Sequence, residues 1–264
     1  MSEPYTAIAP HYDRQGLGQW SRALITFTLD TLLPRYGRHP QTALDLACGT
    51  GNAVIALAMR GLDVVGLDRS AAMLAVARAK AARAGVRCGF VRADLRAFAF
   101  ARPFELITCA YDSLNYLTEP GELRTAFGQI RAALAPQGLL VCDLTTVRAY
   151  ADEPAEPQTF DLGDIAYSWA TAWDLAGQRA TTTLGVTTRS GDRMVTLTEA
   201  HPQRPYARDE VEGALRAAGL QPLGAFATRS LLTPTLDPPT PDTARIIYVA
   251  APAPPTTPPT ETHV

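Results

Sequence analysis

Residues 44–52 read LDLACGTGN, and this stretch decides the fold. An apolar run leads directly into Gly49, Thr50 and Gly51, and a helical pattern begins just beyond them. Glycines at a strand-to-helix turn permit positive φ and let a ligand approach the backbone closely, while the helix start offers free N–H donors. The stretch therefore predicts a strand, a candidate ligand-binding turn and a helix. Taken alone, a Gly-x-Gly pair is equally typical of a plain turn.

Strands and helices are predicted to alternate from residue 43 onward, after an amphipathic helix over residues 19–36. The expected strands are apolar runs of five to seven residues, at 43–47, 63–68, 88–94, 104–110 and 138–144. The expected helices between them cover 52–61, 70–85 and 121–135. This alternation implies a mostly parallel sheet with helices on both faces, which is an α/β fold.

The alternation stops after Leu144, where an Ala-, Glu- and Pro-rich connection covers residues 147–160. Three β-like runs follow, at 165–175, 179–188 and 193–201, separated by the turn signals Ala176-Gly177 and Ser190-Gly191-Asp192. Short strands joined by tight turns favour an antiparallel meander inserted into the parallel domain.

The remaining residues return to the main domain, with a helix over 207–219 and β-runs at 222–229 and 244–250 that form a closing hairpin. The Pro/Thr-rich end of the chain is predicted to be disordered. We therefore divide the chain into a first part of the main domain, an inserted β-subdomain, the second part of the main domain and a tail, at residues 1–146, 147–205, 206–250 and 251–264.

The composition is that of an ordinary globular protein with 264 residues and a formal charge of −2. This charge does not suggest electrostatic binding of nucleic acid, although the net charge does not exclude a local basic patch. The four cysteines lack metal-binding spacing, so we expect reduced, mostly buried thiols and no metal site. With no evident signal peptide and no membrane-spanning run, the expected compartment is the cytoplasm.

Asp68 is the second informative residue, since it ends the strand-like run VVGLD. A carboxylate about 20 residues beyond a glycine turn binds a ribose diol in dinucleotide folds, although Asp68 is also placed to cap the following helix. Val54 stands where the dinucleotide fingerprint needs its third glycine, and no Gly-Lys-Ser/Thr phosphate loop is present. Because the acidic Asp45 precedes the turn, a ligand with an ammonium group and a ribose fits this stretch better than a ligand that carries a phosphate.

The sequence resembles the class I, seven-strand S-adenosylmethionine-dependent methyltransferases, in their small-molecule branch. The resemblance spans about residues 5–146 and 206–250. It is carried by the segments LDLACGTG, VVGLDRSAAML, FVRADLRAF and FELITCAYDSLNYL, and by the opening YTAIAPHYD. It implies a Rossmann-like sheet, with the closing hairpin as antiparallel strands and the insert as a β-lid over the methyl acceptor.

The resemblance also assigns cofactor contacts. Asp45 and the Gly49/Gly51 turn would lie beside the methionine portion, and Asp68 on the ribose hydroxyls. Met73 would pack against the adenine, with Asp94 at its amine. The implied cofactor-binding residues are Tyr12, Asp45, Gly49, Gly51, Asp68, Arg69, Met73, Asp94, Leu95 and Ala110. Tyr5 is expected near Tyr12, or as a packing residue of a terminal helix.

Methyl transfer from a sulfonium is an in-line displacement, so the protein mainly aligns the acceptor and excludes water. A base is needed only when the acceptor arrives protonated. Tyr111, Asp112 and Asn115 follow the fourth strand, where ligands bind in open parallel sheets. Asp112 is a candidate to hold an ammonium group or take a proton, and otherwise to cap the turn.

The insert supplies the other acceptor-side candidates. Ile165, Tyr167, Trp169 and Trp173 share one strand face, which is either an aromatic wall or a sheet core. His201 is a candidate general base or a structural histidine. The substrate-binding candidates are Tyr111, Asn115, Tyr167, Trp169 and Arg204, and the catalytic candidates are Asp112 and His201.

The sequence thus predicts an enzyme that methylates an O or N atom of a small molecule, releasing S-adenosylhomocysteine. Two alternatives stay open: a protein or RNA methyltransferase of the same fold, and a non-catalytic S-adenosylmethionine-binding partner subunit. An NAD-dependent oxidoreductase is disfavoured by Val54. We expect a monomer or homodimer with no nucleic-acid or membrane partner.

Overall fold

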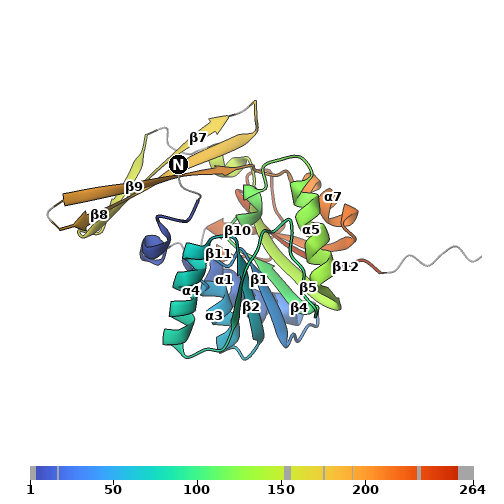
Figure 1. Ribbon diagram of the computed structural model, residues 1–264. Coiled ribbons are helices and arrows are strands. Elements are labelled where there is room, and N and C mark those ends of the chain that lie inside the picture. The colour runs from blue at the N-terminus through green and yellow to red at the C-terminus, as the bar shows by residue number, and fades with distance from the viewer. Residues whose placement is uncertain are drawn as a thin grey trace, which may run out of the picture.

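The computed structural model describes residues 4–16, 18–151, 156–174, 176–191, 193–230 and 233–254. It consists of a central sheet flanked by helices and a separate antiparallel sheet that projects from the body (Figure 1). This arrangement confirms the predicted α/β class with an inserted β-subdomain.

The central sheet has eight strands in the order β11-β10-β12-β5-β4-β1-β2-β3. Its strands are β1 (Thr42–Leu46), β2 (Asp63–Asp68), β3 (Gly89–Arg92), β4 (Phe104–Cys109), β5 (Leu134–Thr145), β10 (Leu220–Ser230), β11 (Thr233–Pro234) and β12 (Arg245–Pro252). Strands β1 to β5 are parallel, and β12 lies antiparallel between β5 and β10. Strand β12 extends to Pro252, two residues into the predicted tail, whose residues 255–264 lie outside the described part of the chain.

Helices cover both faces of this sheet, as the alternation predicted (Figure 1). They are η1 (Ala9–Gln15), α1 (Gly18–Phe27), η2 (Thr28–Leu32), α2 (Leu33–Arg35), α3 (Asn52–Met59), α4 (Ala71–Ala84), η3 (Ser113–Tyr116), α5 (Glu122–Ala133), α6 (Arg148–Ala151) and α7 (Arg208–Ala217). The helix expected over 19–36 forms, with a π-helical turn in its middle at η2. Among the described residues, no helix combines the length and apolar character that spanning a bilayer requires.

Two apolar clusters form the core because successive strand residues face opposite sides of the sheet. In β1, Ala43 joins the cluster beneath α1 and α3, while Leu44 joins the cluster beneath α5 and α7. The strands are buried on both faces, which explains their nearly continuous apolar runs.

The projecting sheet, here called the lid sheet, has the antiparallel order β6-β7-β8-β9. Its strands are β6 (Gln158–Asp161), β7 (Ile165–Asp174), β8 (Arg179–Ser190) and β9 (Arg193–Gln203). The last three match the predicted meander. Strand β6 overlaps the end of residues 147–160, which were predicted to be a connection. Ile165 and Tyr167 of the lid sheet form a small buried cluster with Ile8, so this sheet packs on the N-terminal segment.

Candidate functional site

A pocket lies at the carboxyl ends of β1, β2 and β4, the position at which open parallel sheets bind ligands. We call it the strand-end pocket; it is lined by the turns after these strands, including Gly49, Asp68 and Ala110. The loop after β3 contributes Asp94 and Leu95. The N-terminal segment contributes two tyrosines, Tyr5 and Tyr12.

The two glycines of the turn have different roles. Gly49 has φ of +53° and lines the pocket, and a Cβ added there would meet no atom within 4 Å. A side chain at Gly49 would therefore stand in the open space of the pocket. Gly51 has φ of +78° and does not line the pocket; its Cβ would lie 3.1 Å from the Cβ of Ala77. Gly51 thus permits close packing of the α3 start against α4, not ligand contact.

Asp68 is fixed at the end of β2 by two backbone groups. Its Oδ2 accepts a hydrogen bond from Gly49 N at 2.8 Å, and its Oδ1 accepts one from Ser70 N at 2.8 Å. The N-cap of α4 is Ser70, whose hydroxyl accepts from Met73 N, so the interpretation of Asp68 as the helix cap was wrong. Each carboxylate oxygen keeps a further acceptor site, and Asp68 lines the pocket. Burial raises the pKa of Asp68.

Asp45 is not brought to the pocket. Its side chain is buried and accepts a hydrogen bond from Thr108 Oγ1 at 2.6 Å, across the β1–β4 pair. Burial raises the pKa of Asp45 to about 7, against the lowering effect of the Thr108 hydroxyl. The residue expected beside the methionine portion of the ligand therefore faces a neighbouring strand.

The remaining predicted residues of this group do meet in the pocket. Met73 is buried there, and Asp94 is held by Arg96, whose Nη2 lies 2.7 Å from Asp94 Oδ2. This hydrogen-bonded pair lowers the pKa of Asp94 and keeps it ionised. The predicted cofactor residues that line the strand-end pocket are Tyr12, Gly49, Asp68, Arg69, Met73, Asp94, Leu95 and Ala110.

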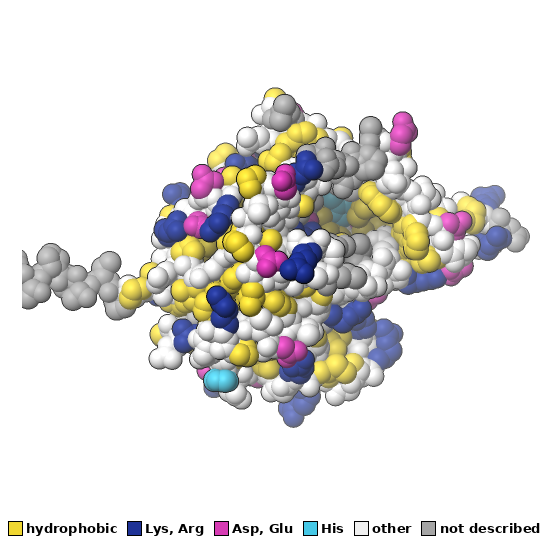
Figure 2. All heavy atoms as spheres, turned by 180° about the vertical axis from the view of Figure 1, so that it is seen from behind, with side chains coloured by type: hydrophobic (Ala, Val, Ile, Leu, Met, Phe, Trp, Pro, Cys, Tyr) yellow, Lys and Arg dark blue, Asp and Glu magenta, His cyan; other side chains and the backbone are white. Residues whose placement is uncertain are grey.

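A second cavity of about 740 Å³, here called the lid cavity, lies between the strand ends and the lid sheet. Figure 2 shows the surface hollowed between the main body and the projecting sheet. Tyr5, Tyr111 and Tyr116 line both the strand-end pocket and the lid cavity. The two spaces therefore adjoin at three tyrosine side chains, which is the place where a group could pass between two ligands.

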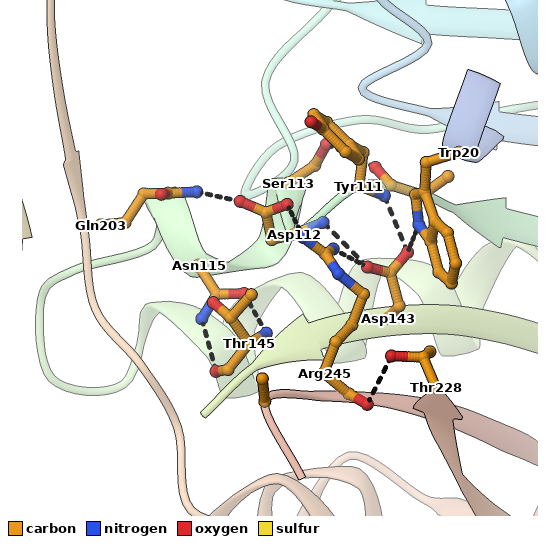
Figure 3. Close-up of polar contacts among 12 residues, drawn as sticks. Trp20, Tyr111, Asp112, Ser113, Asn115, Asp143, Thr145, Gln203, Thr228 and Arg245 are labelled. Atoms are coloured by element: carbon orange, nitrogen blue, oxygen red, sulfur yellow. Dashed lines mark hydrogen bonds and ion pairs between the residues drawn. The ribbon is translucent and has the colours of Figure 1, made fainter. Parts of the chain in front are cut away.

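Buried charges form the base of the lid cavity (Figure 3). Arg245 of β12 lies 2.8 Å from Asp112 Oδ1 and also donates to Asp143. Gln203 of β9 donates to the other oxygen of Asp112. Burial raises the pKa of Asp112, while Arg245 opposes this effect and favours the ionised form. Both oxygens of Asp112 thus already have hydrogen-bond donors, and its side chain lines the lid cavity.

Asp143 also stabilises an unusual backbone at this point. Tyr111 and Asp112 have φ of +64° and +47°, a left-handed conformation that side chains rarely adopt. Asp143 accepts the N–H of Tyr111 at 2.7 Å and that of Asp112 at 3.1 Å, and it accepts Trp20 Nε1 at 3.0 Å. These bonds hold a strained turn whose two side chains line the lid cavity.

His201 belongs to a second polar chain in the lid cavity. Its Nδ1 lies 2.9 Å from the Tyr116 hydroxyl, which lies 2.6 Å from the Tyr5 hydroxyl. Its Nε2 lies 3.5 Å from the buried carboxylate of Glu199. Burial lowers the pKa of His201 to about 4, although Glu199 acts in the opposite direction. The imidazole is therefore neutral near pH 7.

Three of the predicted substrate-binding residues line the lid cavity, namely Tyr111, Tyr167 and Trp169. Tyr167 is buried and donates to the carbonyl of His11 at 3.1 Å, whereas Trp169 is partly exposed. The aromatic wall is only partial, because Trp173 stacks on Tyr150, itself a lining residue, and Ile165 packs in the small core under the lid sheet.

The other two predicted substrate-binding residues do not line the lid cavity. Asn115 is fully buried and donates to the carbonyls of Thr145 and Arg204, so it joins the η3 turn to β5 and to the segment after β9. Arg204 lies over the Tyr206 ring at 4.5 Å and pairs with Glu210. Both predictions of acceptor contact lack support in the geometry because each side chain is used within the fold.

The lining residues of the lid cavity that sequence reasoning missed include Tyr116, Tyr150, Gln203 and Arg245. One signal could have found the last. Arg245 interrupts the apolar run ARIIYVA, and Asp143 interrupts the apolar run GLLVCDL. Because a buried charge needs a partner, opposite charges in two such strands suggest that the strands pair.

Comparisons with known proteins agree with this geometry. A family model described as a methyltransferase domain matches residues 43–138. The chain is 30% identical over 207 residues to the dTDP-3-amino-3,6-dideoxy-alpha-D-glucopyranose N,N-dimethyltransferase of Streptomyces fradiae, covering 73% of this chain and 74% of that protein. It is 36% identical over 141 residues to a protein of Geobacillus sp. (strain WCH70), covering 52% of this chain and 57% of that protein.

A solved structure extends the likeness to the whole fold. The S-adenosylmethionine-bound amino pentose methyltransferase from Micromonospora echinaspora matches with a TM-score of 0.72 at 20% identity, over 96% of this chain and 100% of that one. The chain belongs to the class I S-adenosylmethionine-dependent methyltransferases. Its cofactor is S-adenosylmethionine. The Asp68 carboxylate at the strand end fits the ribose of that molecule, and the open space at Gly49 fits its amino-acid portion.

Proposed function

We propose that this methyltransferase transfers the methyl group to an amino group of a small, sugar-like acceptor, with a hydroxyl group as the alternative target. One observation carries the proposal: the lid cavity adjoins the strand-end pocket at Tyr5, Tyr111 and Tyr116. A cavity of about 740 Å³ has room for a small molecule beside the cofactor. The named relatives that act on amino sugars support the choice of acceptor class.

The cofactor contacts in this proposal follow the strand-end pocket. Asp68 accepts hydrogen bonds from the ribose hydroxyls, Met73 and Leu95 flank the adenine, and Asp94 meets its amine. Tyr12 covers the cofactor from the N-terminal segment. Asp45 and Gly51 are left out of the binding set because neither lines the pocket.

The acceptor contacts follow from charge. Asp112 holds the acceptor's amino group, since its carboxylate lines the lid cavity and ion pairing by Arg245 favours its ionised form. His201 is unprotonated near pH 7 and lies 2.9 Å from the Tyr116 hydroxyl, so it orients this tyrosine beside the acceptor, whose amine reacts in its unprotonated form. The tyrosines and the lid sheet exclude water while the cofactor sulfonium supplies an activated methyl group.

The test combines binding and turnover. Calorimetric titration with S-adenosylhomocysteine establishes the cofactor site, and NAD serves as the comparison ligand. A panel of nucleotide-linked amino sugars, matched deoxy sugars without the amino group and quinols is then incubated with S-adenosylmethionine, and methylated products are identified by mass spectrometry. We expect methylation of amino sugars only. Cofactor binding with methylation of quinols alone would overturn the acceptor class and leave the cofactor site intact.

We also propose a cytoplasmic location, which the four free cysteines support because such thiols are typical of reducing compartments. The oligomeric state and the absence of a nucleic-acid partner stay predictions. The division of the chain at residues 146, 205 and 250 also stays a proposal.

A further inference from the structure

The N-terminal segment, residues 5–16, covers the place where the strand-end pocket and the lid cavity meet. Tyr5 lines both spaces, and Tyr12 lines the strand-end pocket. The two rings contact each other edge to face, with their centroids 5.8 Å apart. The segment therefore forms part of the wall around the strand-end pocket.

Asp13 fastens one end of the segment to the main domain. Its carboxylate accepts from Thr50 Oγ1 at 2.8 Å and Asn52 Nδ2 at 2.9 Å, and it pairs with Lys80 at 2.7 Å. These three partners lie in the glycine turn, at the start of α3 and on α4. None of these three partners belongs to the lid sheet.

Glu199 of β9 fastens the other end, and it belongs to the lid sheet. Its carboxylate accepts from the backbone N–H groups of four consecutive residues, at 2.6 Å from Tyr5, 3.0 Å from Thr6, 2.5 Å from Ala7 and 3.3 Å from Ile8. Its side chain is fully buried. A buried carboxylate is costly without partners, so these donors are what makes its position tolerable.

The closed segment also orders the polar chain of the lid cavity. With Glu199 holding the backbone of Tyr5, the Tyr5 hydroxyl reaches Tyr116, which contacts His201. The same carboxylate lies 3.5 Å from Nε2 of His201. One side chain of the lid sheet thus contacts both the cover of the cofactor pocket and the histidine of the acceptor cavity.

We propose that Glu199 is a positioning residue that latches the N-terminal segment to the lid sheet, so that retention of the cofactor depends on the lid sheet being in place. Hydrogen bonds to an ionised carboxylate are stronger than neutral ones, so the latch favours the closed segment. The exposed Arg14–Asp164 pair joins the same two parts but contributes little. The inference rests on the S-adenosylmethionine site and not on the acceptor proposed above.

The test is a double-mutant cycle read by calorimetric affinity for S-adenosylhomocysteine. Its members are Glu199→Gln, a chain lacking residues 1–8, and the two changes combined. We expect each single change to weaken binding about tenfold or more, and the combination to weaken it no further than the deletion. Glu119→Gln is the matched control, because Glu119 pairs with Arg179 of β8 and so also joins the lid sheet to the body. It should leave affinity unchanged.

Proteolysis supplies a second readout that does not depend on affinity. Trypsin cleavage after Arg14 should be faster in Glu199→Gln than in the unaltered protein or in Glu119→Gln, at equal melting temperature. Loss of affinity in Glu199→Gln that persists at full size in the deleted chain would overturn the latch. Unchanged affinity and unchanged cleavage in Glu199→Gln would overturn it too. Failure of the unaltered protein to bind S-adenosylhomocysteine would instead contradict the cofactor site.

Discussion

Arg245 Nη2 lies 2.8 Å from Asp112 Oδ1, although the two residues are 133 positions apart in the chain. Asp112 follows β4 and Arg245 begins β12, and β5 separates these two strands in the sheet. The ion pair therefore bridges across β5 and closes the base of the lid cavity, where Asp143 from that intervening strand completes it (Figure 3).

Replacing Arg245 with methionine should strongly destabilise the fold. The change leaves Asp112 and Asp143 buried without their cation, and breaking such a pair costs about 3–5 kcal/mol. Urea denaturation measures the free energy of unfolding. Arg229→Met is the control, because Arg229 forms an exposed pair with Asp237 and should cost under about 1 kcal/mol. Equal losses in the two variants would contradict the importance of the buried triad.

Asp68→Ala should weaken binding of S-adenosylhomocysteine by about 1–3 kcal/mol, because two ribose hydrogen bonds are lost. Calorimetry measures the dissociation constant. Asp63→Ala, at the exposed start of the same strand β2, is the matched control and should bind normally. Normal affinity in a folded Asp68→Ala variant would remove this residue from the cofactor site.

Alanine at the two glycines of the turn should have separable effects. Both positions have positive φ, so each substitution strains the backbone by about 1–2 kcal/mol. Gly51→Ala adds a Cβ contact at 3.1 Å to Ala77 and should lower the free energy of unfolding more. Gly49→Ala places its methyl in the pocket and should lower cofactor affinity more. Thermal unfolding and calorimetry on both variants decide this, and a reversed ranking would contradict the assignment.

His201 should make stability depend on pH. Its pKa is lowered from 6.5 to about 4 by burial, so the folded protein binds fewer protons than the unfolded chain between these values. The free energy of unfolding contributed by neutral His201 is present above pH 6.5 and is lost as pH falls toward 4. Asp45, with a pKa raised to about 7, makes the free energy of unfolding fall as pH rises. The contribution of His201 is therefore measured by comparing proteins that differ at His201 alone.

We therefore expect His201→Asn to lose stability less steeply than the unaltered protein on acidification from pH 6.5 to 4. Asparagine keeps an acceptor near the position of Nδ1 for the Tyr116 hydroxyl. His39→Asn, at an exposed position, is the control. Urea denaturation across this pH range gives the slopes, and parallel slopes for His201→Asn and the unaltered protein would show that His201 does not titrate in this way.

Much of the fold follows from local patterns. The parallel strands, the helices between them and three of the four lid strands were predicted from periodicity, because burial imposes a period on each element. The exception, β6, is short and mostly exposed and lies among Pro and Glu residues, so no periodic signal marks it. The glycine turn and Asp68 were predictable because their spacing within one strand–turn–helix unit is fixed.

The site was less predictable where side-chain direction decides the role. Asp45, Asn115 and Arg204 stand at the right ends of their elements, yet each is bonded to a neighbouring part of the fold. A position in a strand or turn places a residue near a site, but its rotamer and hydrogen-bond partners come from elements that are distant in sequence.

The sequence by itself determined the class of protein, the α/β architecture, the cofactor and the turn that faces it, because these depend on short-range spacing and on residue types. Only the tertiary structure decided which side chains meet: Arg245 with Asp112, Glu199 with the backbone of residues 5–8, and Tyr116 with His201. The physical reason is that hydrogen bonds and ion pairs act over a few ångströms and depend on direction. They are settled only when packing brings distant segments together.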